Sequence, residues 1–199
     1  VFVAEEKEGR PRGTYDATWT RKGKRGEDAD RFYDKAAAQE VLDRVSGRAG
    51  LVTTVDKKKK VERPPFLYDL TTLQKEANKR FGYSAKKTLD LAQALYETHK
   101  LLTYPRTDSR HLSKDQEPTL PGVLSGVAFG PYQVAAQATL DRWPVKLSKR
   151  VVDDAEVSDH HAIIPTGEDA RGARLTVEEK RIFDLVTRRF LAVFCADAV

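Results

Sequence analysis

The spacing of hydrophobic residues changes about a third of the way along this 199-residue chain, at Pro64-Pro65. Before these prolines, apolar and polar residues alternate over 14–20, which predicts a half-buried strand, and 50–55 predicts a second strand. Between them, the short apolar pattern at 35–45 predicts one helix. The first third therefore predicts extended structure with one inserted helix.

After the prolines, apolar residues recur every three to four positions, as on one face of a helix. A helix is expected to open near Thr71, where Thr-x-x-Gln has the form of a capping box, and to stop at Gly82. Ser84 is expected to cap a second helix that ends near Lys100. Two short helices joined by a tight turn resemble a helix-turn-helix motif in outline.

The last third predicts a mixture of irregular segments and helices. Two prolines and three glycines in 117–130 predict loops or short helical turns. A helix is expected over 132–140, followed by irregular or extended chain over 153–166. A second capping box at Thr176 opens a long helix that continues through Leu191. The predicted fold class is α+β.

The net charge of +5 is unevenly distributed along the chain. Between Lys57 and Lys114 there are 14 Lys and Arg against 6 Asp and Glu, the pattern typical of a protein that binds a polyanion. Solvated helix faces give the same excess, and the four lysines at 57–60 equally fit protection of an exposed strand edge. Charge alone therefore leaves nucleic-acid binding as one of two interpretations.

Cysteine content and hydrophobic run length exclude several classes of protein. Cys195 is the only cysteine, so an internal disulfide is excluded and a reducing compartment such as the cytoplasm is expected. No apolar run approaches the roughly 20 residues of a membrane span. The chain opens with Val1 rather than Met and has no signal peptide, so we expect a piece of a longer protein.

Residues 101–109 (LLTYPRTDS) concentrate reactive side chains around a proline. Pro105 disfavours helical geometry at Tyr104, and in an extended segment Tyr104, Arg106 and Asp108 project to the same side. A tyrosine hydroxyl is protonated at neutral pH, but a neighbouring guanidinium favours the phenolate and holds a phosphodiester through two hydrogen bonds. An aromatic wall beside a surface ion pair fits the same residues, so this alternative stays open.

Two adjacent histidines, His160 and His161, form the second candidate for chemistry. In an extended segment they point in opposite directions, so only one can serve a given site. Such a histidine either binds a phosphate, moves a proton near neutral pH, or simply bonds to loop backbone. Zinc is disfavoured, because the other nitrogen and sulfur ligands, His99, His111 and Cys195, have no recognisable zinc spacing.

Several segments resemble the type IA DNA topoisomerases, and the topoisomerase III branch in particular. Residues 101–109 are similar to the active-site signature of that family, and in this branch a proline commonly separates the Tyr from the Arg. Residues 66–74 (FLYDLTTLQ), 84–89 (SAKKTL) and 160–166 (HHAIIPT) are also similar to the family, in the correct order. The resemblance therefore extends over the middle of the chain.

The resemblance implies that the longer protein is an enzyme, an ATP-independent isomerase that relaxes or decatenates DNA. Tyr104 would attack a phosphodiester of single-stranded DNA and form a reversible 5′-phosphotyrosine link, so that another strand passes before religation. Arg106 would clamp the scissile phosphate, and His160 would contact DNA phosphate near the cleavage point. These are the three catalytic residues that the resemblance implies.

Two further groups of residues follow from the same resemblance. The DNA-binding residues expected are Arg106, Lys86, Lys87 and Arg110. The residues expected to support the loop that carries the tyrosine and the arginine are Asp108, Thr107 and Ser109.

The family's chemistry also uses a Toprim domain, which supplies a lysine, a glutamate and an Asp-x-Asp-x-Glu cluster for Mg²⁺. This chain has one near match, Asp28-Ala29-Asp30, with Phe32 where the glutamate would stand. We therefore expect the Mg²⁺ site in the longer protein and no metal in this chain. DNA cleavage by the chain alone is not expected.

The resemblance implies an α+β architecture in three parts. Residues 1–65 would form a β-rich arch segment, 66–190 a mainly helical, helix-turn-helix-like gate domain that carries Tyr104, and 191–199 the return to the arch. The expected partners are single-stranded DNA and the missing Toprim and arch domains of the same polypeptide. We expect a monomer in the bacterial cytoplasm, associated with the nucleoid and not with a membrane.

Two alternatives of other classes are considered. One is a non-catalytic module that binds single-stranded nucleic acid through a helix-turn-helix core. The other is a tyrosine recombinase, which also forms phosphotyrosine links but places its tyrosine after the arginine and histidine residues. Here Tyr104 precedes His160 by 56 positions, and this order argues against a recombinase.

Overall fold

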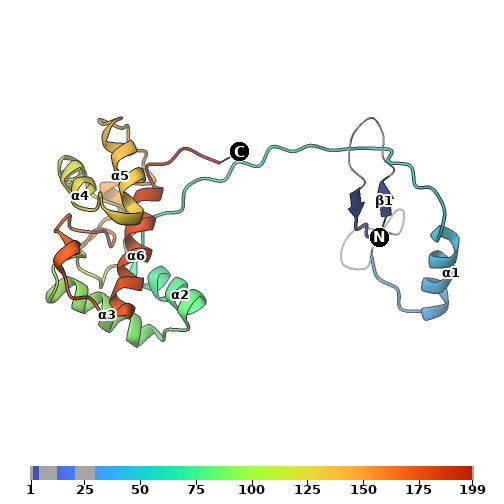
Figure 1. The fold of residues 1–199 in the computed structure, drawn as a ribbon, viewed down its shortest axis with the longest axis horizontal. Coiled ribbons are helices and arrows are strands. Elements are labelled where there is room, and N and C mark those ends of the chain that lie inside the picture. The colour runs from blue at the N-terminus through green and yellow to red at the C-terminus, as the bar shows by residue number, and fades with distance from the viewer. Residues whose placement is uncertain (1, 5–12, 21–29, 199) are drawn as a thin grey trace. The chain divides into compact units, whose positions relative to one another are not determined.

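The computed structural model describes residues 2–4, 13–20 and 30–198. The chain divides into two compact units, an N-terminal unit of residues 1–57 and a helical unit of residues 58–199, and both are drawn in Figure 1. No helix in the described ranges is long and apolar enough to span a bilayer.

The N-terminal unit contains a short hairpin and one helix. Strand β1 (Phe2–Ala4) pairs antiparallel with β2 (Gly13–Tyr15). Helix α1 (Lys35–Val45) begins after Asp34, whose carboxylate accepts a hydrogen bond of 2.9 Å from the backbone N–H of Ala36. The predicted helix at 35–45 is therefore confirmed with the same bounds.

The strands predicted in this unit are largely wrong. The strand predicted over 14–20 ends at Tyr15, and 50–55 forms no strand at all. Leu51 and Val52 are exposed, and no described segment pairs with theirs. A lone extended segment has no ladder of hydrogen bonds to stabilise it, so a strand-like residue pattern does not suffice.

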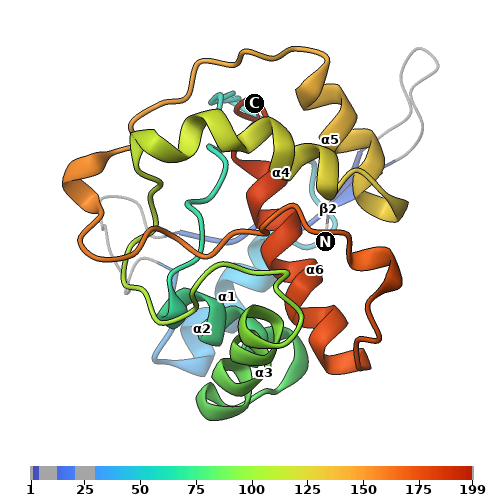
Figure 2. The ribbon, with the colours of Figure 1, turned by 90° about the vertical axis from the view of Figure 1, so that its left-hand side faces the viewer.

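The helical unit is built from five α-helices joined by extended chain and 3₁₀ turns. Within the described part of this unit, the helices are α2 (Leu70–Phe81), α3 (Ala85–Glu97), α4 (Leu120–Gly126), α5 (Gln133–Leu140) and α6 (Val177–Ala192). The 3₁₀ turns there are η1 (Lys114–Thr119), η2 (Gly130–Tyr132), η3 (Asp154–Glu156) and η4 (Ala170–Gly172). In Figure 2, α6 runs through the middle, with α2 and α3 towards one end and α4 and α5 towards the other. The prediction of a mainly helical domain is confirmed.

Helix α6 forms the centre of the hydrophobic core. Ile182, Val186 and Phe190 are fully buried, and α6 packs closely against both α2 and α3. The capping box predicted at Thr176 is present, because Thr176 and Glu179 exchange side-chain to backbone hydrogen bonds. Since α6 packs against both helices, it holds α2 and α3 in place.

The start predicted for α3 is confirmed, whereas the residue predicted to cap α2 is wrong. Asp69, not Thr71, caps α2, because its carboxylate accepts a 2.6 Å hydrogen bond from the N–H of Thr72. Gly82 ends α2 at a φ of 69°, as predicted, and the hydroxyl of Ser84 caps α3 by accepting from the N–H of Lys87. An aspartate can cap as well as a threonine, and the sequence window offered both.

The loops or short helical turns expected over 117–130 are confirmed by the 3₁₀ turns η1 and η2 and by the short helix α4 that lies between them. Pro121 lies in its first turn, where a helix loses no hydrogen bond to the missing N–H. At its end, Gly126 lies directly against the backbone of Gly167, and a Cβ at Gly126 would stand 1.8 Å from the Gly167 carbonyl oxygen. This contact fixes the end of the 160–166 segment against α4.

We predict that Gly126→Ala lowers the free energy of unfolding by about 2 kcal/mol or more, because the methyl group has no room against Gly167. Gly122→Ala on the same helix is the matched control, since a Cβ there meets nothing within 4 Å. It should be neutral or stabilising by about 0.5–1 kcal/mol. Urea denaturation of both variants checks the prediction, and equal stabilities would contradict it.

A second prediction concerns Glu179, which lies nearly buried at the start of α6. Burial alone would raise its pKa, but hydrogen bonds from Thr176, with a lesser contribution from His99, lower the pKa below the usual 4.5. A carboxyl group whose pKa is lower in the folded state than in the unfolded state stabilises the folded protein at pH values above the unfolded-state pKa. This contribution is lost as the pH falls through the folded-state pKa.

Glu179→Gln should therefore cost about 1 kcal/mol at pH 7, because the charged acceptor is lost, and less at acid pH. The measurement is the free energy of unfolding in urea at pH 7 and at pH values below 4.5, for both proteins. The difference between the two proteins should shrink as the pH falls. A difference that stays constant over this range would show that the carboxylate charge is irrelevant.

Candidate active site

Three extended segments lie side by side in the helical unit and hold the candidate site. The N–H of Thr103 donates to the carbonyl of Ile164 (2.9 Å), and the N–H of Ile164 donates back to the Thr103 hydroxyl (3.0 Å). The N–H of Ile163 donates to the carbonyl of Tyr68 (2.8 Å). Segments that are distant in sequence, around 68, 103 and 164, are thus joined by backbone hydrogen bonds.

Side chains alternate between buried and exposed along the loop that follows Tyr104. The exposed ones in this stretch are Arg106, Asp108 and Arg110, and the buried ones are Pro105, Thr107 and Ser109. This is the period of two that the sequence predicts for an extended segment. Tyr104 itself is half-buried.

The buried hydroxyls of this loop tie it to the segment that carries the histidines. The Thr107 hydroxyl donates to the carbonyl of His160 (2.8 Å) and accepts from the N–H of Ser109 (3.1 Å). The Ser109 hydroxyl donates to the carbonyl of Glu156 (2.8 Å) and accepts from the N–H of His111 (3.1 Å). Buried hydroxyls with both roles satisfied hold a loop in one conformation.

Tyr104 contacts two aromatic rings. Its ring centroid lies 4.3 Å from that of His160, with the planes inclined at 45°. Tyr96, on α3, meets it edge to face at 5.5 Å. His161 lies with its Nδ1 2.8 Å from the carbonyl oxygen of Ala162, which it reaches as a donor. It is therefore His160, and not its neighbour, that lies against the tyrosine.

Arg106 is exposed, and its charge is not neutralised by any described residue. Its Nη2 donates to the Oε1 of Gln93 on α3 at 3.3 Å, which orients the guanidinium without removing its charge. Asp108 forms no ion pair with Arg106 or with any other described residue. The interpretation of the two as a surface ion pair is therefore wrong.

Tyr104 and both histidines line a hollow of about 370 Å³. Ser113, Gln116 and Ser158 contribute polar groups to its wall, and three carboxylates, Asp115, Asp154 and Asp159, also line it. The hollow is thus open to a polar ligand beside the Tyr104 ring.

The described residues do not fit a magnesium site. In those ranges no group of three or more His, Cys, Asp or Glu side chains stands close enough to hold a metal ion, in this hollow or elsewhere. Asp28 and Ala29, the first residues of the partial Asp-x-Asp match, lie outside the described residues.

Two buried tyrosines, Tyr68 and Tyr132, are unsuited to a nucleophilic role. Burial raises the pKa of Tyr68, although the Arg189 guanidinium that bonds its hydroxyl acts in the opposite direction. Burial and then the hydrogen bond to Asp184 raise the pKa of Tyr132 far above the usual value of 10. Tyr104 differs from both in facing a hollow.

Comparison with known proteins decides the family. Residues 7–199 match the family described as DNA topoisomerase. The chain is 48% identical over 163 residues to DNA topoisomerase 3 of Bacillus cereus (strain ATCC 14579), and 46% identical over 164 residues to DNA topoisomerase 3 of Bacillus subtilis (strain 168). The chain belongs to the DNA topoisomerase family. The predicted kinship with the type IA enzymes, topoisomerase III in particular, is confirmed.

A solved structure agrees in fold with this topoisomerase chain. Full-length topoisomerase I from Thermotoga maritima superimposes with a TM-score of 0.55 at 26% identity, over 86% of this chain and 27% of that one. The alignments with the two Bacillus proteins cover 82% of this chain but only 22% of each relative. The chain therefore spans about a fifth of the length of the relatives it matches.

The residues expected to bind DNA are dispersed around the topoisomerase site. Lys86 is exposed on α3 and pairs with Asp90 at 2.7 Å, whereas Lys87 pairs with Glu178 at the start of α6. Arg110 lies 3.9 Å from Asp69. Only Arg106, among these expected residues, lacks a carboxylate partner in the part of the chain that the structure describes.

Two residues that contact the site were not identified from the sequence. Gln93 and Tyr96 lie one turn apart on α3, and one contacts Arg106 while the other contacts Tyr104. Their spacing of three residues was a usable signal, because it puts both on one helix face. The sequence does not show that this face of α3 is turned towards Tyr104, because its orientation depends on how α3 packs against α6.

We predict that Thr107→Val costs about 1–3 kcal/mol of unfolding free energy, because it leaves the carbonyl of His160 and the N–H of Ser109 without their partner. Thr71→Val, at an exposed position in the first turn of α2, is the control and should change stability by about 0.5 kcal/mol or less. Urea denaturation measures both. If the two variants lose the same stability, the hydroxyl of Thr107 does not hold the loop.

Proposed function

We propose that this chain carries the strand-cleaving part of a type IA DNA topoisomerase, with Tyr104 as the nucleophile. The observation that carries the proposal is the position of Tyr104. Its ring is half-exposed beside a polar hollow, lies against His160, and is followed by an arginine without an acidic partner among the described residues. No other tyrosine of the described chain lines this hollow.

The proposed reaction is a transesterification. The phenolic oxygen of Tyr104 attacks a phosphorus atom of single-stranded DNA, the bond from phosphorus to the 3′ oxygen breaks, and a 5′-phosphotyrosine forms. The phenol loses a proton and the leaving 3′ oxygen gains one. Religation is the reverse, with the 3′ hydroxyl as nucleophile and Tyr104 as leaving group. One ester replaces another, so no nucleotide is consumed.

Arg106 and His160 are assigned supporting parts in this reaction. Arg106 holds the phosphate and stabilises the charge that builds on its oxygens in the transition state, and Gln93 orients the guanidinium. His160 contacts the same phosphate or exchanges the proton of the phenol, since its ring lies against that of Tyr104. Thr107 and Ser109 keep the loop in place, whereas Asp108 has no hydrogen bond with a described residue through which to organise it.

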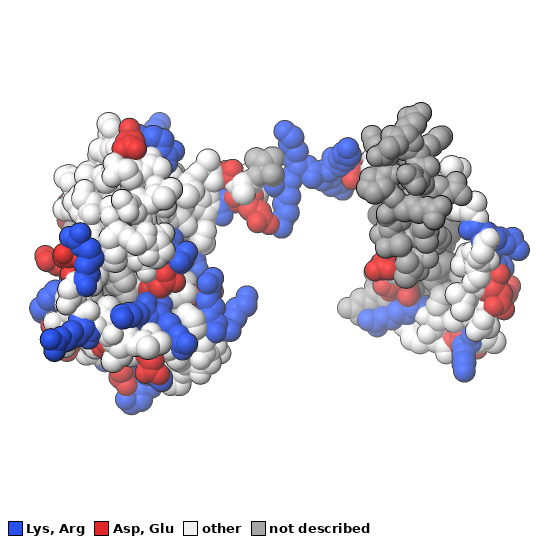
Figure 3. Space-filling view, viewed as in Figure 1, with Lys and Arg blue, Asp and Glu red and all other residues white. Residues whose placement is uncertain are grey.

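Single-stranded DNA is the proposed partner, bound along one side of α3. Lys86 and Gln93 are seven residues apart, which places them on one helix face about 10 Å apart along the axis. A strand that lies along this face passes Lys86, then Arg106, then Arg110. Lys87 is turned towards α6 by its pair with Glu178, so we give it a smaller part. In Figure 3, Lys and Arg of the helical unit gather in the half that holds α2 and α3.

We assign the remaining chemistry to parts of the protein outside this chain. A Toprim domain with Mg²⁺ would complete the site in the longer protein, and this chain alone would not cleave DNA. As a whole, the enzyme would relax or decatenate DNA, as a monomer in the bacterial cytoplasm at the nucleoid. The low share of its relatives that the chain spans supports this division.

We also propose that 66–190 is a gate domain and that 1–65 and 191–199 belong to a β-rich arch. The support is the pairing of the segments that flank the helical core. Glu62 and Ala198 exchange two backbone hydrogen bonds, of 2.8 and 2.9 Å, as neighbours in an antiparallel sheet do. The hairpin of β1 and β2 adds a second piece of β-structure in this part of the chain.

The test is the formation of a covalent DNA adduct by the full-length protein that contains this chain. Tyr104→Phe should reduce adduct formation from a labelled single-stranded oligonucleotide by roughly a thousandfold or more, because the nucleophilic oxygen is removed. Tyr33→Phe, at a highly exposed tyrosine of the N-terminal unit, should leave it unchanged. An adduct that still forms in Tyr104→Phe would sink the assignment of Tyr104 as the nucleophile, and no adduct with the unaltered protein would favour a binding module without catalysis.

A further inference from the structure

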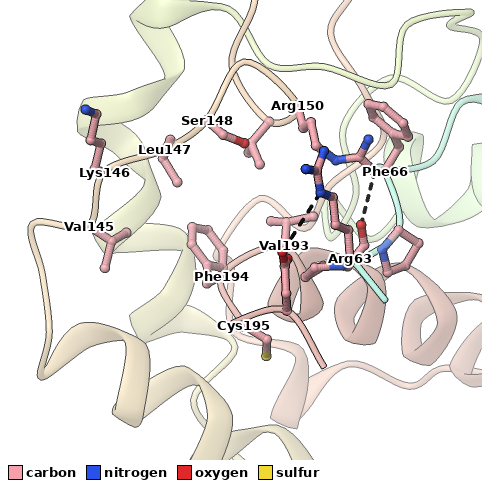
Figure 4. Close-up of a pocket in the computed structure, with 14 residues that line it drawn as sticks. Arg63, Phe66, Val145, Lys146, Leu147, Ser148, Arg150, Val193, Phe194 and Cys195 are labelled. Carbon is pink, nitrogen blue, oxygen red and sulfur yellow. Dashed lines mark hydrogen bonds and ion pairs between the residues drawn. The ribbon is translucent and has the colours of Figure 1, made fainter. Parts of the chain in front are cut away.

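A second hollow lies in the helical unit, and it shares no lining residue with the hollow at Tyr104. We call it the neck pocket, because its walls come from segments 63–66 and 193–197, through which the chain enters and leaves the helical core, and from 145–151. Its volume is about 210 Å³ (Figure 4). The function proposed for Tyr104 does not use this pocket.

The neck pocket is lined by both cationic and apolar side chains. Arg63, Lys146 and Arg150 line it with one carboxylate, Asp197, whereas Leu147 and other apolar side chains make up much of the rest. In Figure 4, Arg63 and Arg150 lie near Phe66 on one side, with Lys146 on the other. Three cations with one anion leave an excess of positive charge at this partly apolar wall.

Arg150 is held in place by contacts that leave its charge unneutralised. Its guanidinium stacks 3.9 Å above the ring centroid of Phe66, and its Nη2 donates to the carbonyl of Pro64 at 3.3 Å. Within the described residues, neither Arg150 nor Lys146 forms an ion pair, and Arg63 reaches Asp197 only at 3.9 Å. A guanidinium that is fixed by stacking and still has free N–H donors is pre-organised for a phosphate.

We propose that the neck pocket binds a phosphate group of a single nucleic-acid strand, at a second position outside the cleavage site. The charge around the pocket favours a strand over an isolated anion. Arg110, on the loop that carries Tyr104, lies 4.9 Å from the ring centroid of Phe66, so this ring joins the pocket to that loop. The exposed lysines 58–60 lie three to five residues before Arg63 in the chain, and of these Lys60 pairs with Glu62.

A strand bound in this way touches both segments of the neck. Arg63 is paired with Asp197, which lies two residues after Cys195. A phosphate that binds to Arg63 competes with this weak ion pair. Binding would therefore act on the junction at which Glu62 and Ala198 exchange backbone hydrogen bonds. The proposal shares with the proposed function only the need for a nucleic-acid strand, and it requires no cleavage.

The single thiol of the chain supplies a local reporter, because Cys195 lines the neck pocket and is exposed. The first measurement is the rate at which iodoacetamide, a neutral reagent, alkylates Cys195 in the 199-residue chain. Short oligothymidylate should slow the alkylation severalfold, and inorganic phosphate at the same phosphate concentration should not. Equal protection by phosphate alone would mean an isolated-anion site and would overturn the strand proposal.

The second measurement is the salt dependence of oligothymidylate affinity, by fluorescence anisotropy. Lys146→Gln and Arg63→Gln should each reduce the slope of log K against log salt, by no more than about 0.7, the value for one phosphate contact on a single strand. Arg150→Gln should do the same. Arg174→Gln, an exposed arginine outside the pocket, is the charge-matched control and should leave the slope unchanged.

The outcomes separate this proposal from the one for Tyr104. Lys146 is exposed and has no hydrogen bond or ion pair to other described residues, so Lys146→Gln keeps the test valid even if Arg150→Gln fails to fold. Unchanged alkylation of Cys195 in the presence of bound oligothymidylate, or equal slopes for Lys146→Gln and Arg174→Gln, would refute the neck site. Neither result bears on adduct formation at Tyr104, and a missing adduct would leave the protection of Cys195 unaffected.

Discussion

The candidate site depends on one partly buried hydrogen bond, from the hydroxyl of Thr107 to the carbonyl of His160 (2.8 Å). The two residues are 53 positions apart, and the bond sets the distance between the tyrosine loop and the histidine segment. The Thr107 hydroxyl is buried, and leaving it without a partner costs free energy, so this bond resists any separation of the two segments. Tyr104 lies against His160 because Thr107, three residues after Tyr104, is hydrogen-bonded to the backbone of His160.

Helix α3 transmits the rigidity of the core to this loop. Ala92 and Leu95 are fully buried, while Gln93 and Tyr96 contact Arg106 and Tyr104. A helix cannot move one face without the other, so the buried residues fix the orientation of those that touch the site. Packing of α3 against α6 thus determines where the arginine points, although α6 contributes no side chain to the hollow.

Sequence reasoning succeeded where structure is determined locally. The helix at 35–45, the stop at Gly82, and the alternation after Tyr104 all follow from residues within a few positions of one another. It failed where the local structure depends on residues that are distant in the sequence. The segment 50–55 has the composition of a strand but no described neighbour to pair with. Gln93 was missed for the same reason, since its role exists only once α3 is packed.

Two arginines without a carboxylate partner among the described residues, Arg106 on the Tyr104 loop and Arg150 in the neck pocket, have a common physical meaning. A guanidinium near a partly buried wall is costly to hold without an anion, and proteins usually place a carboxylate beside it. Arg106 and Arg150 are instead oriented by neutral groups, an amide oxygen in one case and an aromatic ring with a carbonyl in the other. Neutral partners orient each guanidinium group but do not neutralise its positive charge, which can still attract an anion. Such an arrangement favours a ligand that brings its own negative charge at regular intervals, as the backbone of a nucleic acid does.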